Sequence, residues 1–163
     1  MNHKGHAGLT LLVFSLLMLP FGPNENAIIV IVLAAGLSSL PDIDIRWEIR
    51  HRGYTHNVLA GLVVGIAFGL LFFYSASNVL WGVMGFVVGF GGIICHLLGD
   101  TFTYMKFKPL WPFSDRKIGL GWFESGSKQV NNGMMMAGSL GFVFYLLVTT
   151  GTLEKLIFSF SIF

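Results

Sequence analysis

The chain has 163 residues, of which 54% are hydrophobic and only 11% are charged. A soluble domain carries about 25% charged residues, so this composition excludes an ordinary soluble globule and favours an integral membrane protein. The formal net charge of +2 is too small to indicate a nucleic-acid-binding protein. The single cysteine, Cys95, excludes an internal disulfide, and its apolar surroundings favour a buried small side chain.

The first two apolar runs are short. Residues 7–19 follow a polar start with Lys4, and we expect a retained first helix because the polar residues 20–26 offer no small-x-small cleavage site. Residues 27–40 form the second run, which ends at Pro41. Both runs fall short of the roughly 20 residues that cross a bilayer. This shortness suggests that a site at their polar ends is slightly recessed into the membrane.

Three longer apolar runs follow and are expected to span the membrane: residues 57–74, 79–100 and 132–150. In the first of them Gly61, Gly65 and Gly69 recur every four residues, which places them on one helix face and allows close helix packing in lipid. The next run is also rich in glycine, so these faces could pack within one chain or in a homo-oligomer. The sequence predicts one all-α membrane domain, residues 1–163, with about five helices. The tail, residues 152–163, is expected to lie in the interface or to extend the bundle.

Alternating crossings would bring the histidines and aspartates of the chain to one membrane face. His3 and His6 precede the first run, Asp42 and Asp44 follow the second, His51 and His56 precede the third, and His96 and Asp100 close the fourth. Imidazole and carboxylate are the ligands of zinc and related divalent ions. All ten Lys and Arg residues except Lys155 fall on this same face. By the positive-inside rule it is the cytoplasmic face of an inner (plasma) membrane protein.

The histidine spacings allow two interpretations each. His96 and Asp100 lie one helical turn apart, so they share a helix face and can bind one ion. The alternative is a His–Asp hydrogen bond that closes the helix. His51 and His56 are five residues apart and need a bend at Gly53 to converge. The alternative is a pair of interfacial histidines.

The two carboxylates of Asp42-Ile-Asp44 follow a proline that ends a helix. They could bridge two ions or activate water, and the alternative is a solvated turn. Of the eight His and Asp residues at the predicted helix ends on this face, seven are plausible ligands of metal ions. Seven ligands exceed the four of one structural zinc site. We therefore expect two or three divalent ions, with zinc as the expected element and open positions for water and substrate.

The loop that follows the fourth run is basic and aromatic. It carries Lys106, Lys108, Trp111, Arg116, Lys117 and Trp122. Such residues are typical of a membrane interface. The functional alternative is that Arg116 or Lys117 folds over the ions and binds an anionic group such as a phosphate.

A series of short motifs runs along the chain: Gly5-His6, Leu40-Pro-Asp-Ile-Asp44, His51-Arg-Gly-Tyr-Thr-His-Asn57, His96-Leu-Leu-Gly-Asp100 with Thr103, and Leu110-Trp-Pro-Phe113 with Arg116. In this order they resemble the YdjM-like family of membrane-bound, metal-dependent hydrolases. The resemblance covers about Gly5 to Phe123 and extends more distantly to zinc-dependent phospholipase C. The resemblance implies a multi-pass helical hydrolase in which seven residues are metal ligands or lie beside them: His6, Asp42, Asp44, His51, His56, His96 and Asp100. His3 lies outside this pattern, and the resemblance does not specify the substrate.

We therefore expect a membrane-bound hydrolase of a phosphoester in a lipid or lipid-linked substrate. Asp42 or Asp44 would bridge ions or orient water, while Arg52, Arg116 or Lys117 would stabilise developing charge. Lys117 and Trp111 are the expected substrate contacts. The alternative is a non-catalytic membrane protein whose structural metal holds short helices together while its loops dock or regulate a partner. Transport is disfavoured because no charged residue lies near the middle of any predicted span.

Overall fold

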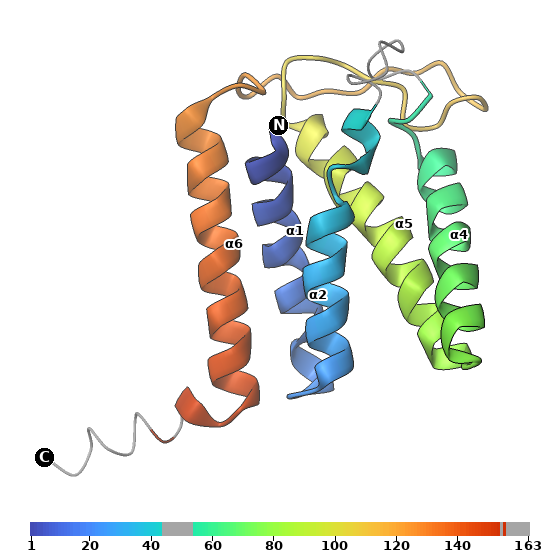
Figure 1. Cartoon of the computed structure of the whole chain (residues 1–163). Helices are drawn as coiled ribbons and strands as arrows, with labels where there is room; N and C mark the ends of the chain where they lie inside the picture. The colour runs from blue at the N-terminus through green and yellow to red at the C-terminus, as the bar shows by residue number, and fades with distance from the viewer. Residues whose placement is uncertain (44–53, 154, 156–163) are drawn as a thin grey trace, which may run out of the picture.

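The computed structural model describes residues 1–43, 54–153 and 155. Across these residues the chain forms five helices that are long and apolar enough to cross a membrane, and no strand (Figure 1). The predicted all-α membrane bundle of five helices is thereby confirmed. Asp44, His51, Arg52 and the expected bend at Gly53 lie outside the described residues.

The two short runs are lengthened by 3-10 turns. Helix α1, His3–Met18, continues into η1, Leu19–Phe21, and helix α2, Glu25–Leu37, is followed by η2, Leu40–Asp42. Each combined segment reaches the length of a membrane span, at 19 and 18 residues. Asn2 begins α1 because its side chain accepts a hydrogen bond from the Gly5 amide. The helix therefore starts at His3 rather than at residue 7, and His6 lies within the span.

The next two helices, α4 (Val58–Ala76) and α5 (Val79–Thr101), pack against each other through glycine. A Cβ added at Gly89 would lie 2.9 Å from the Val64 carbonyl oxygen, so only glycine permits this approach. Gly65 and Gly69 of α4 likewise face side chains or backbone of α5. The glycine-rich faces of these two helices are thus packed together within one chain.

The last helix, α6 (Lys128–Thr149), packs against α1 on the side away from α4 (Figure 1). It starts at Lys128 rather than at residue 132, because the Ser127 side chain accepts a hydrogen bond from the Val130 amide. The helices alternate in direction, so the N-terminus, η2, the start of α4 and the end of α5 all lie at one end of the bundle. The loop from α5 to α6 crosses that same end.

Candidate metal centre

Five of the predicted ligands are brought together inside the bundle. They are His6, Asp42, His56, His96 and Asp100, which we call the His/Asp cluster. Asp42 is 8% exposed, and the other four side chains are at most 1% exposed. Two groups in the cluster have donor atoms that all lie within 4.8 Å of one another: His6, His96 and Asp100, and Asp42, His56 and His96. Burial of this many ionisable groups requires a compensating partner.

The helix ends position these side chains. His6 lies in the first turn of α1, and Asp42 ends η2, which Pro41 helps to start. His56 directly precedes Asn57, whose side chain accepts a hydrogen bond from the Ala60 amide and begins α4. His96 and Asp100 occupy the last two turns of α5, one turn apart. The predicted convergence of helix ends therefore holds for these five residues.

The backbone of α2 fixes the tautomer of His96. Its Nδ1 lies 2.8 Å from the Ser38 carbonyl oxygen, and a carbonyl can only accept. Nδ1 therefore carries the hydrogen, and in the neutral ring the lone pair is on Nε2. A second partner of this kind is typical of a metal-binding histidine because it orients the ring.

Each of the two carboxylates lies close to the facing nitrogens of His56 and His96. His56 Nε2 and His96 Nε2 are 3.1 Å apart. Asp42 Oδ1 lies 3.4 Å from His56 Nε2 and 3.6 Å from His96 Nε2. Asp100 Oδ2 lies 3.6 Å from both nitrogens. Zinc bonds of about 2.0–2.2 Å in a tetrahedron would place the ligand atoms roughly 3.3–3.6 Å apart, so the two imidazoles with either carboxylate fit three positions of one divalent ion.

His6 adds a further donor beside this set. Its ring stacks on His96 with the centroids 3.7 Å apart, and its Nε2 lies 3.4 Å from Asp100 Oδ1. Among the described residues neither ring nitrogen of His6 has a hydrogen-bond partner, although the side chain is fully buried. A buried polar nitrogen left in this state is costly, and a bound cation would coordinate the ring nitrogen that carries the lone pair. Asp100 Oδ1 also pairs with the Met1 amino group at 2.7 Å.

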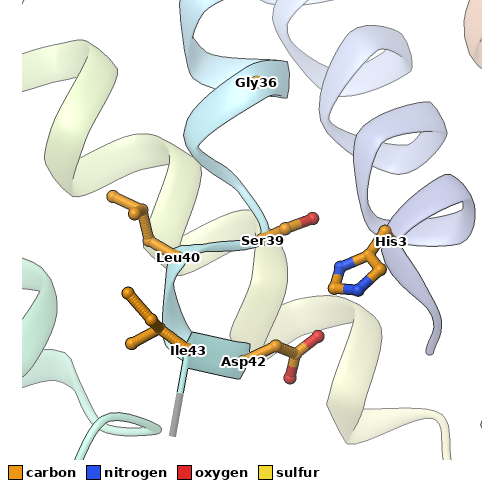
Figure 2. A pocket seen from close by; sticks show the side chains of 6 residues that line it. All are labelled: His3, Gly36, Ser39, Leu40, Asp42 and Ile43. Carbon is orange, nitrogen blue, oxygen red and sulfur yellow. The ribbon is translucent and has the colours of Figure 1, made fainter. Parts of the chain in front are cut away.

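An open pocket of about 260 Å³ reaches the cluster at Asp42. We call it the Asp42 pocket; it is lined by His3, Gly36, Ser39, Leu40, Asp42 and Ile43. Figure 2 shows Asp42 pointing from η2 toward His3 of α1. His3, which lies outside the family pattern, is thus no member of the cluster but lines its approach. The pocket gives small molecules access to one of the candidate ligands.

The loop residues with predicted substrate roles lie at the same end of the bundle but not in the cluster. Arg116 and Lys117 are exposed, and neither forms an ion pair with any part of the chain that is described. Trp111 packs edge to face on Tyr54, with the ring centroids 5.1 Å apart. Lys108 pairs with Asp115, and this hydrogen bond holds the pKa of that carboxyl below its usual range. The roles of Arg116, Lys117 and Trp111 stay predictions.

Three supporting residues escaped prediction. The role of the Ser38 carbonyl could not be predicted from the sequence, because every residue has a backbone carbonyl. Gly99 allows His6 to approach α5, since a Cβ there would lie 3.0 Å from His6 Nδ1. Asn131, fully buried in α6, accepts a hydrogen bond from the Asn2 amide at 3.0 Å and so anchors the start of α1. Two features of the sequence could have indicated Gly99 and Asn131. One is a glycine between His96 and Asp100, and the other is an asparagine within a spanning helix.

A family model described as "YdjM inner membrane protein" matches residues 1–162. The match extends beyond the predicted Gly5–Phe123 and includes α6 and most of the tail. No curated protein and no solved structure matches the chain. The more distant resemblance to zinc-dependent phospholipase C stays a prediction.

Proposed function

We propose that this chain, which belongs to the YdjM inner membrane protein family, is a metal-dependent hydrolase of a phosphoester in a lipid or lipid-linked substrate. The chain is an integral membrane protein by its family and its five apolar helices. The observation that carries the proposal is the position of Asp42. It belongs to a buried donor set and also lines an open pocket, as a site that binds both an ion and a substrate requires.

We assign the residues of the cluster to different roles. Asp42, His56 and His96 would hold one ion, and His6 and Asp100 would hold another. Such ions polarise a phosphoryl oxygen and lower the pKa of bound water towards about 7. Asp42 would orient water that enters from its pocket, and the Ser38 carbonyl keeps the His96 ring in place. Hydrolysis joins the water oxygen to phosphorus, and the ester oxygen leaves as an alcohol.

The location of the cluster favours a substrate in the membrane. Its residues lie at the ends of spanning helices, where the phosphate groups of a bilayer are found. Arg116 and Lys117, together with Arg52, would stabilise the negative charge that develops on the phosphoryl group. Lys117 and Trp111 would contact the substrate. The density of basic residues at this end favours the cytoplasmic face.

A structural metal is the second candidate, and the burial of the cluster favours it, because four of its five side chains are at most 1% exposed. A structural zinc ion has every position filled by protein atoms. Such an ion would hold α2, α4 and α5 together without chemistry. On this account removal of the ion unfolds the bundle.

The test is the metal content of detergent-purified protein, measured by elemental analysis for wild type and His96→Ala. His96 belongs to both donor groups, so its removal should cost both ions and abolish turnover of phosphoester lipids, while the protein still inserts. His3→Ala is the control for the ion count, because His3 lies outside the cluster.

The outcomes separate the candidates. Two or more ions per chain, lost in His96→Ala together with turnover, support the hydrolase. One ion that resists chelation, unfolding when it is finally removed and an absence of turnover support the structural role. Full activity of His96→Ala contradicts the hydrolase assignment, and an absence of metal from wild type contradicts both.

A further inference from the structure

A second cavity, of about 210 Å³, lies on the other side of η2 from the Asp42 pocket. We call it the α4 groove; it is lined by Leu40, Pro41, Ile43, Tyr54, Thr55, Ala60, Val64 and Ile93. Leu40 and Ile43 line both cavities. Figure 2 shows these two side chains pointing away from His3, to the side of η2 opposite the one on which Asp42 points. The turn therefore separates a cavity with mixed polar and apolar walls from an almost wholly apolar one.

The α4 groove touches the His/Asp cluster and also enters the membrane span. Two of its residues, Pro41 and Thr55, directly precede the candidate ligands Asp42 and His56. Its far end is formed by Val64, about two turns into α4, and by Ile93 of α5. The groove thus runs from the cluster toward the hydrocarbon part of the bilayer.

We propose that the α4 groove holds one hydrocarbon chain of the lipid substrate. The phosphoester would then lie over η2 at Asp42, and the polar end of the substrate would face the Asp42 pocket. An apolar cavity beside one that carries His3, Ser39 and Asp42 suits an amphipathic molecule, because its hydrocarbon end and its polar end each meet matching side chains. This inference rests on the proposed function.

The size of the groove sets the number of chains. Its volume of about 210 Å³ is below the roughly 300–1,000 Å³ of cavities that enclose a drug-sized ligand. It therefore accommodates the headgroup-proximal part of one chain and not two chains side by side. The rest of the chain would continue along α4, where Val63 and Ile66 are exposed on the lipid-facing surface.

The substitution Ala60→Phe tests the groove by filling it. Two substrates with the same phosphoester are compared, one with a long alkyl chain and one that is short and water-soluble. We expect kcat/KM for the long-chain substrate to fall at least about tenfold, the effect of losing burial of roughly two methylene groups. The short substrate should be hydrolysed as by wild type, because it does not use the groove.

The matched control is Ala67→Phe, the same change at an exposed position two turns further along α4. It should leave both substrates unaffected. An equal loss for both substrates in Ala60→Phe, or no loss for either, overturns the inference while the hydrolase proposal stands. If wild type hydrolyses neither substrate, the hydrolase proposal fails. A binding measurement alone then decides whether the α4 groove holds a hydrocarbon chain.

Binding is measured in nanodiscs with an alkyl phosphonate that carries a diazirine in its chain, followed by mapping of the crosslinks. Crosslinks to Tyr54, Val64 or Ile93, lost in Ala60→Phe and kept in Ala67→Phe, support the inference. Crosslinks confined to Val63 and Ile66 on the outer surface overturn it. Equal labelling of the groove by a diazirine chain on phosphatidylcholine shows an ordinary membrane lipid there and also overturns it.

Discussion

Gly99 controls how closely His6 can approach the end of α5. A Cβ added at Gly99 would lie 3.0 Å from His6 Nδ1 and 3.1 Å from the Met1 sulfur, both closer than ordinary packing. His6 has no room to retreat, because its ring is stacked on His96 and fully buried. The position of one donor atom thus depends on the absence of a methyl group.

Gly99→Ala should therefore weaken metal binding without unfolding α5. Alanine favours the helix, but the displaced His6 ring should cost about 10- to 100-fold in affinity, as changes around metal ligands typically do. Competition with a chelator measures the affinity, and circular dichroism the helix. Gly133→Ala is the control, since nothing lies within 4 Å of a Cβ there. Unchanged affinity in Gly99→Ala would exclude His6 from the metal site.

At the scale of elements, α1 and α6 meet through two facing glycines. A Cβ added at Gly138 would overlap the Gly8 backbone, and one added at Gly8 would overlap the backbone at Met135. Close approach of this kind supplies the packing energy between helices in lipid. It also holds α1, and with it His6, against the rest of the bundle.

Gly138→Ala should destabilise the protein by about 1–3 kcal/mol, the usual cost of overpacking. The expected result is a lower melting temperature in detergent. Gly133→Ala, five residues earlier on the same helix and exposed, should be neutral or slightly stabilising. If Gly138→Ala melts with wild type, the contact between α1 and α6 does not contribute to stability.

The helices themselves were largely predictable, because each is a long apolar run that begins near a polar cap. The errors lie where polar residues are helical: His3 and Lys4 belong to α1 because Asn2 caps it, and Lys128 belongs to α6 because Ser127 does. The gathering of His and Asp side chains at one end of the bundle could be predicted from helices that cross the membrane in alternating directions. The stacking of His6 on His96 could not be predicted, because it depends on how α1 and α5 pack against each other, which no residue pattern encodes.

At the scale of the whole molecule, the basic residues and the His/Asp cluster lie at the same end of the bundle. Besides Lys4 and Lys128, the loop there carries Lys106, Lys108, Arg116 and Lys117. At the opposite end the charged residues among those described are Glu25, at the start of α2, and Lys155, which follows α6. Orientation follows the position of Lys and Arg in short loops. The substrate would then reach the His/Asp cluster from the cytoplasmic side of the membrane.

This orientation can be tested with a matched pair of single substitutions, Ser125→Cys at the cluster end and Ser75→Cys at the other. Both serines are exposed, and the native Cys95 is buried, so wild type should stay unlabelled. In intact spheroplasts a membrane-impermeant maleimide should label Ser75→Cys but not Ser125→Cys. Lysis should make Ser125→Cys reactive. The reverse pattern would place the His/Asp cluster on the outer face and would require a substrate from the outer leaflet.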